Sequence, residues 1–274
     1  MHKKNILNLT LFVFALSLVS IIYFSEEKNT ELEKLSTINK TDITSITIQH
    51  NEISTKIIKQ KNNHWQITQP VKIPANDFRI NSILKLINAP VHSKYLLSEV
   101  NLSDIGLSNP TTSIQLNEKK FIFGIINTAT NLRYVQLDEF VYTIEDVYFP
   151  LLSSHFGTLV SLNLLPENSN IEKLILSNQT ISKNEKDLWR SNITISADNI
   201  NKTIAHWQQD QAFGVHEYLE RKQLGEVFIF LKDQPQAISY LIADTDPWLI
   251  LARPEIGLEY HLDGDVYKNL IAPK

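Results

Sequence analysis

Hydrophobic and polar residues alternate with a period of two over most of the chain, which is typical of β-strands that bury one face. Isoleucines alternate with polar residues between Ile43 and Ile58, and Trp65 and Ile67 continue the alternation after a polar turn. This pattern predicts three successive antiparallel strands. The same alternation predicts further strands at 112–116, 119–125, 132–137 and 140–144.

A helix is predicted between these two groups of strands. Pro70 and Pro74 are expected to end the first group, because proline cannot donate to a sheet ladder. Asn76 and Asp77 then supply a helix N-cap. The following apolar residues recur at i, i+3, i+4 and i+7, which gives a helix one apolar stripe. These residues are Ile80, Ile83, Leu84 and Ile87.

The same order of features returns in the second half of the chain. Trp189 corresponds to Trp65, and Asp198 corresponds to Asp77 and predicts a second N-cap. The helix spacing returns at Ile200, Thr203, Ile204 and Trp207. We expect an α+β fold of two tandem homologous units, each with antiparallel strands packed against a helix. The predicted units are residues 43–160 and 161–274.

The N-terminal segment has a different pattern. Ile6 to Phe24 is an uncharged, mainly apolar run as long as a bilayer-spanning helix, with basic residues before it and glutamates after it. It predicts a transmembrane anchor at 6–24, a cytoplasmic N-terminus at 1–5 and a juxtamembrane spacer at 25–42. A removed signal peptide and a buried core helix are the alternatives. The bulky end of the run, with no small-x-small site after it, favours the anchor.

Composition and charge exclude several classes of function. Apolar residues make up 43% and charged residues 20% of the 274 residues, which is typical of globular proteins. The net charge is −4, and without Lys3 and Lys4 it is 24 − 30 = −6. An acidic body lacks the basic footprint that nucleic acids select, so nucleic acid is not an expected partner. The chain has no cysteine, which excludes disulfides and cysteine-ligated metals.

A set of turn and strand-end residues resembles a known family. The pattern is a Trp and Pro strand end, an Ala-Asp helix start, a Gly-Leu-x-x-Pro turn, a Gly-ended strand and a Tyr-Val strand. These residues are Trp65, Pro70, Ala75, Asp77, Gly106, Leu107, Pro110, Gly124, Tyr134 and Val135. Over Ile43 to about Leu152 the chain resembles the bacterial family known as domain of unknown function 4340. Trp189 and Asp198 carry the pattern into the second unit.

The resemblance implies a location more than a chemistry. Members of this family are typically single-span proteins with bodies outside the cytoplasm, often encoded near gliding-type ABC transport components. It therefore implies a single-pass protein of the bacterial inner membrane, held through Ile6 to Phe24 and facing the periplasm. The motif residues are expected to be architectural. Gly106 and Gly124 suit a positive φ or a bulge, and Pro110 suits a strand entry.

The sequence contains no strong motif for an active site or a metal site. The eight histidines show no metal-ligand spacing, and no nucleophile elbow or phosphate-binding loop occurs, so no metal, cofactor or catalytic residue is predicted. The only carboxylates that suggest an enzyme are Asp244, Asp246, Asp263 and Asp265. Turns and caps are the simpler interpretation of these residues.

Three function hypotheses follow. The first is a membrane-anchored scaffold or accessory subunit outside the cytoplasm, serving a gliding-type ABC transport or envelope system and using exposed sheet edges. The second is a binding module for an envelope glycan or similar ligand, which would stack on Tyr134, Trp248 or Tyr260. The third, an enzyme that uses the carboxylates above, is remote.

Overall fold

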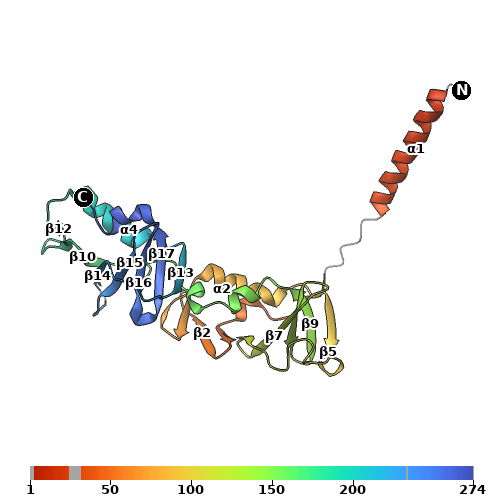
Figure 1. The fold of residues 1–274 in the computed structure, drawn as a ribbon, viewed down its shortest axis with the longest axis horizontal. Helices are drawn as coiled ribbons and strands as arrows, with labels where there is room; N and C mark the ends of the chain where they lie inside the picture. Colours follow the sequence, from red (N-terminus) through yellow and green to blue (C-terminus); the bar gives the residue numbers. More distant parts are fainter. Residues whose placement is uncertain (1–2, 25–31, 233, 274) are drawn as a thin grey trace.

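A computed structural model describes residues 3–24, 32–232 and 234–273, with the side chains of 3–8 and 21–24 left out of the description. The predicted cytoplasmic end at 1–5 and the predicted spacer at 25–42 therefore lie partly outside the described residues. The described residues form two antiparallel β-sheets with few helices (Figure 1). The expectation of an α+β fold was too helical, since the structure is mostly β.

The first sheet has nine strands in the order β4-β3-β2-β1-β6-β7-β8-β9-β5. One face of each central strand is buried, as the alternation predicts; Ile46, Ile48 and Ile57 all point into the core. The strands are β1 (Ser45–His50), β2 (Ile53–Lys59), β3 (Trp65–Gln69), β4 (Ile73–Pro74), β5 (Ser93–Leu96), β6 (Thr112–Leu116), β7 (Lys119–Asn127), β8 (Leu132–Leu137) and β9 (Phe140–Glu145).

The predicted first helix forms, but it is short. Helix α2 covers Asp77–Ile83 and continues as a 3-10 helix, Leu84–Asn88. Asn76 is its N-cap, because its side chain accepts a hydrogen bond from the backbone N–H of Arg79. The predicted end of the sheet at Pro74 was wrong: Pro74 belongs to β4, an edge strand in which a missing N–H is tolerated.

The second sheet has eight strands in the order β12-β11-β10-β14-β15-β16-β17-β13. When β4 is left out and the strands of each sheet are counted along the chain, the two sheets have the same strand order. The strands are β10 (Ile171–Leu176), β11 (Gln179–Lys183), β12 (Trp189–Ser191), β13 (Gly214–Glu217), β14 (Gly225–Leu231), β15 (Ile238–Asp244), β16 (Trp248–Arg253) and β17 (Leu258–Asp263).

Helix α4 (Ala197–Gln209) packs its apolar stripe, which includes Ile204 and Trp207, against this second sheet. The prediction of Asp198 as its N-cap was wrong. Ser196 is the N-cap, and its hydroxyl accepts from the backbone N–H of Asn199, while Asp198 lies in the first turn. Short helices complete the described chain: α3 (Phe149–Leu152), α5 (Tyr267–Leu270), and the 3-10 helices Lys40–Asp42, Leu97–Glu99, Phe156–Leu159, Pro254–Ile256 and Gly264–Val266.

The segment between the sheets is hydrogen-bonded to both of them. Leu159 accepts from Asn76 and Ser161 donates to Pro74, beside β4, whereas Leu162 accepts from Ala212, just before β13. One cluster of buried hydrophobic residues also continues from the first sheet into the second. The two sheets are therefore joined by backbone pairing and by a shared core.

Helix α1 (Lys3–Phe24) lies apart from the two sheets (Figure 1). Among the residues that the structure describes, no helix combines the length and the apolar character needed to cross a membrane. The transmembrane anchor at 6–24 thus stays a prediction.

Candidate functional site

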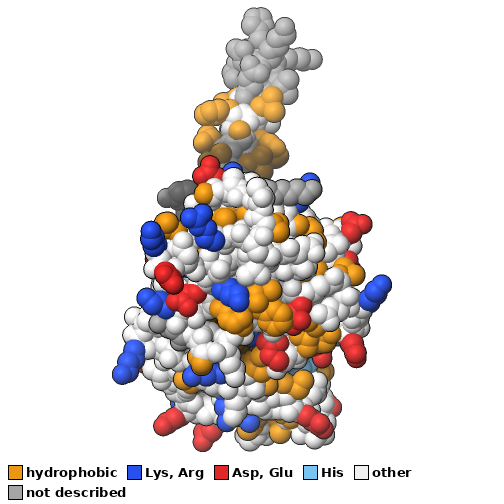
Figure 2. Space-filling model, turned by 90° about the vertical axis from the view of Figure 1, so that its left-hand side faces the viewer, with side chains coloured by type: hydrophobic (Ala, Val, Ile, Leu, Met, Phe, Trp, Pro, Cys, Tyr) orange, Lys and Arg blue, Asp and Glu red, His pale blue; other side chains and the backbone are white. Residues whose placement is uncertain are grey.

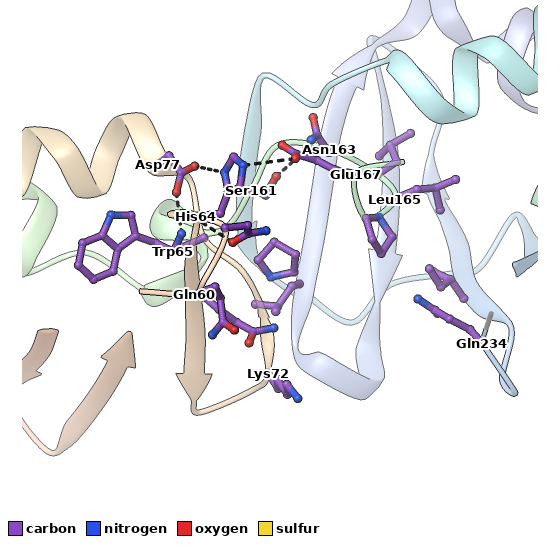
Figure 3. Close-up of a pocket in the computed structure, with 18 of the residues that line it drawn as sticks. Gln60, His64, Trp65, Lys72, Asp77, Ser161, Asn163, Leu165, Glu167 and Gln234 are labelled. Carbon is purple, nitrogen blue, oxygen red and sulfur yellow. Dashed lines mark hydrogen bonds and ion pairs between the residues drawn. The ribbon is translucent and has the colours of Figure 1, made fainter. Parts of the chain in front are cut away.

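A cleft of about 740 Å³ lies between the two sheets. Its walls come from the β2–β3 and β3–β4 turns, from the segment that joins the sheets, and from β15, β16 and β17 (Figure 3). Its lining is mixed, since amides such as Gln60 and Gln234 and the cation of Lys72 alternate with apolar residues. This volume lies in the range of natural small-ligand sites.

His64 lies at the mouth of the cleft between two carboxylates (Figure 3). Its Nδ1 donates to Asp77 Oδ2 at 2.6 Å, and its Nε2 is 3.8 Å from Glu167 Oε2. The other oxygen of Asp77 accepts the backbone N–H of Trp65 at 2.9 Å. Asp77 thus ties the start of β3 to the start of α2 and orients the imidazole.

The two carboxylates change the titration of His64. The hydrogen bond to Asp77, the charge of Asp77 and then the charge of Glu167 raise the pKa of His64 above its usual value. Above the usual pKa, where an isolated imidazole is neutral, this ring still carries its proton. The two carboxylates thus favour the charged form of His64, which links the β2–β3 turn to α2 and to the joining segment.

The inner wall contains a partly buried cation. The guanidinium of Arg253 lies 5.7 Å from the ring centre of Tyr240, and its Nε donates to Glu255 at 2.8 Å. Tyr240 donates its hydroxyl to the backbone carbonyl of Leu164. Burial raises the pKa of Tyr260 to about 12, so this phenol stays neutral at physiological pH. The wall thus offers one cation that is held in place by buried tyrosines.

A family model described as domain of unknown function DUF4340 matches residues 65–221. The chain belongs to this family. The comparison with curated proteins and the comparison with solved structures gave no match. In this DUF4340 protein the matched segment begins at Trp65 and includes Asp77, Glu167 and the joining segment, so it supplies most of the cleft mouth.

The family-pattern residues of this DUF4340 protein have structural contacts. Trp65 is buried, and Ala75 pairs with Val160 of the joining segment. Gly106 has a φ of +70°, as expected. Gly124 lies at a register shift of β7, where an added Cβ would come within 2.2 Å of the carbonyl oxygen of Ile105. In the second sheet Trp189 is only half-buried.

The remaining pattern residues lie in turns or strands of the first sheet. Pro70 follows a cis peptide bond, and Leu107 is buried under β7. Pro110 precedes β6, which agrees with a strand entry.

The predicted stacking residues are not brought together. Tyr260 is 2% exposed, so its prediction as a stacking platform was wrong. Its place in β17 explains this, because Leu258, Tyr260 and Leu262 share the inward face. Tyr134 is half-buried in the first sheet, where its hydroxyl accepts from Asn127. Trp248, in the second sheet, is 47% exposed and stays available.

The candidate carboxylates lie in a turn and at the start of a short helix. Asp244 Oδ1 accepts the backbone N–H groups of Thr245 and Asp246, and Asp263 precedes the 3-10 helix that contains Asp265. Within the part of the chain that the structure describes, no group of three or more histidines and carboxylates is arranged to hold a metal ion.

Sequence reasoning missed a buried cation in the first sheet. Arg133 donates to the carbonyl of Gly124 at 2.6 Å and forms an ion pair with Asp146, and its guanidinium lies 3.6 Å from the ring centre of Phe149. An arginine at an inward position of an otherwise apolar strand was the available signal. Its contacts make it a structural residue that holds the β7 bulge.

The outer edge of β5 is the other candidate surface. The first sheet ends at β5, and in the described chain no strand pairs with the far side of this strand. Tyr95 and Leu96 are both exposed. The chain enters the first sheet beside this strand, since Leu35 donates to Ala89 and Lys94 pairs with Glu33.

Proposed function

We propose that this protein is a membrane-anchored accessory or scaffold subunit, without catalytic activity of its own, whose body lies outside the cytoplasm. It would serve a gliding-type ABC transport or envelope system of the bacterial inner membrane, and its partner would be a membrane protein of that system. The observation that carries the proposal is the open edge of β5 beside the point where the chain enters the body.

The proposed anchor is the apolar run Ile6 to Phe24. As a helix, α1 extends for roughly 33 Å at 1.5 Å per residue, close to the thickness of the hydrocarbon core of a bilayer. Its described side chains, such as Leu11, Phe12 and Val19, are exposed, and hydrophobic side chains cover this part of the helix (Figure 2). A lipid environment is one in which such side chains are stable.

Chain length then keeps β5 close to the proposed membrane surface. Seven residues separate Phe24 from Leu32, and the eight Cα–Cα steps between them span at most about 28 Å. Leu35 already pairs beside β5. An edge strand within this distance of the bilayer can reach the extracytoplasmic part of a membrane protein. Strand addition to such an edge is a common mode of partner recognition.

The edge can be tested at Leu96. The N–H of Leu97 donates to the carbonyl of Glu139, just before β9. Because the bonded N–H groups alternate in an antiparallel ladder, the N–H of Leu96 points outward. Leu96 has a φ of −69°, which a proline adopts without strain. Leu96→Pro therefore removes an outward donor and preserves the pairing of β5 with β9.

The experiment is cross-linking of the tagged full-length protein in native membranes, followed by mass spectrometry. We expect ABC permease or envelope subunits to be recovered with the wild type and with the control Leu96→Ala, which keeps the N–H. Leu96→Pro should reduce the recovery about tenfold, the effect of losing roughly 1.4 kcal/mol. Recovery of the protein alone would argue against a subunit role. Equal recovery of partner subunits with the wild type and with Leu96→Pro would show that the β5 edge does not bind the partner.

We also propose that the body arose by duplication, with units at 43–160 and 161–274. The matching strand orders of the two sheets, β4 apart, support this, as do the α2 and α4 helices that follow Trp65 and Trp189. The reading predicts that the strand cores of the two sheets superpose in an experimental structure, with differences confined to turns and β4.

A second candidate function, an envelope ligand-binding module, is favoured by the cleft. Lys61, Lys72 and Arg253 give it cations that suit a ligand with carboxylates, such as a cell-wall fragment. Calorimetry should then detect binding of such fragments, and Lys72→Glu should weaken it about tenfold. Lys120→Glu, an exposed lysine of β7 outside the cleft, is the matched control. If the fragments bind equally well to Lys72→Glu and Lys120→Glu, the ligand binds outside the cleft.

A further inference from the structure

Two aromatic side chains of the second sheet lie side by side at the surface. Phe213 directly precedes β13, and Trp248 is the first residue of β16. They are 50% and 47% exposed, and their ring centres are 5.6 Å apart at an angle of 70°. Exposed aromatic residues in contact with each other mark binding sites more often than single ones do.

A histidine of β17 completes this cluster. The ring centre of His261 lies 6.1 Å from that of Phe213 and 6.3 Å from that of Trp248. Its Nε2 donates to Glu259 Oε1 at 2.8 Å. When the ring is neutral, its Nδ1 is an acceptor. His261 thus presents a polar atom of fixed orientation among apolar rings.

The carboxylate that holds His261 is buried, since Glu259 is only 2% exposed. Its oxygens also accept from Nη2 of Arg221, at 2.9 and 2.7 Å, and from the backbone N–H of Leu219. A buried charge is tolerated only when it is paired and hydrogen-bonded in this way. The network therefore fixes the imidazole, and Arg221 balances the charge of Glu259.

A second imidazole lies next to the first. His216 of β13 is exposed, and its ring centre is 4.6 Å from that of His261. A Cβ at Gly214 would lie 2.6 Å from Nε2 of His216, so the glycine makes room for this ring on the same face of β13. Burial, followed by the neighbouring His261, lowers the pKa of His216, which keeps this ring neutral at neutral pH.

We propose that Phe213, Trp248, His216 and His261 form a binding site for a neutral sugar ring of an oligosaccharide. The apolar C–H face of a sugar packs on an aromatic ring, while its hydroxyls need donors and acceptors in the same plane, which the two imidazoles supply. Glu259 offers no unpaired charge to an ionic ligand, because Arg221 is already paired with it. The proposal does not depend on the β5 edge.

The test is a glycan array probed with the full-length protein in detergent, followed by fluorescence titration with the neutral oligosaccharides that bind. We expect neutral glycans to bind, and Trp248→Ala and Phe213→Ala each to weaken the affinity at least tenfold. His261→Gln, which keeps a donor and an acceptor, should weaken it only a few-fold. Phe230→Ala, which removes an exposed aromatic ring of β14 outside the cluster, is the matched control and should bind normally.

Three results would overturn the proposal: no neutral glycan binds, binding survives Trp248→Ala, or only charged glycans bind. Loss of the cross-linked membrane partner in Trp248→Ala, without any glycan binding, would identify the cluster as a protein contact. Because both aromatic side chains are half exposed, the thermal unfolding of these variants should match the wild type. Leu96→Pro should leave glycan binding unchanged, so the two proposals can fail separately.

Discussion

Gly124 lies where a side chain has no room. A Cβ there would approach the backbone carbonyl of Ile105 to 2.2 Å, and a backbone atom cannot move aside as a flexible side chain can. Gly124→Ala should therefore lower the free energy of unfolding by about 2 to 3 kcal/mol. Gly257→Ala is the control, because Gly257 has a φ of +68° but open space around it, and it should cost about 1 kcal/mol. Urea unfolding that ranks the two in the opposite order would refute the steric argument.

His64 should give the protein a pH dependence with a definite sign. Because its pKa is raised in the folded state, its contribution to stability is complete below the unfolded pKa of 6.5 and is lost as the pH rises through the folded value. Asp77→Asn keeps an oxygen for the N–H of Trp65 but removes the charge. An NMR titration should then show a lower His64 pKa in Asp77→Asn, and Glu167→Gln should lower it less. An unchanged His64 pKa in Asp77→Asn would show that Asp77 is not the cause.

At the scale of elements, the start of α4 shows which side chain caps the helix. The hydroxyl of Ser196 caps the helix, whereas Asp198 only lies near its positive end. Ser196→Ala should cost about 1 kcal/mol of stability, and Asp198→Ala only a few tenths of that. Chemical denaturation of both variants measures the difference. A larger loss of stability in Asp198→Ala than in Ser196→Ala would show that Asp198 is the N-cap.

The strands could be predicted because their information is local. Alternation identified β1, β2 and β3, and the same alternation in β17 puts Tyr260 on the face of Leu258 and Leu262, so its burial was within reach of the sequence. The cleft could not be predicted from the sequence. His64 lies in a turn, Asp77 at the start of a helix and Glu167 in the joining segment, and only the fold brings them together. The exposed pair of Phe213 and Trp248 depends in the same way on which strands become neighbours.

At the scale of the whole molecule, the joint between the sheets decides how the body unfolds. The joining segment pairs with the end of β4 and the residue after it, Ala75, and with the residue before β13 through Leu162 and Ala212. A shared cluster of buried side chains continues across it. Separating the sheets would expose apolar surface and break backbone hydrogen bonds together, so each sheet stabilises the other.

We therefore expect the two sheets to unfold in one cooperative transition. Hydrogen exchange followed by mass spectrometry in increasing urea should show the slowest amides of β1 and of β10 becoming exposed at the same urea concentration. Val160→Pro removes the N–H that Val160 donates to Gly157 and disturbs the joint; it should split the transition in two. Val160→Ala keeps the backbone pairing and serves as the control, because it loses only buried side-chain contacts and should lower both midpoints together. Two separate transitions in the wild type would mean that the sheets are independent domains and that the cleft between them can open without unfolding either one.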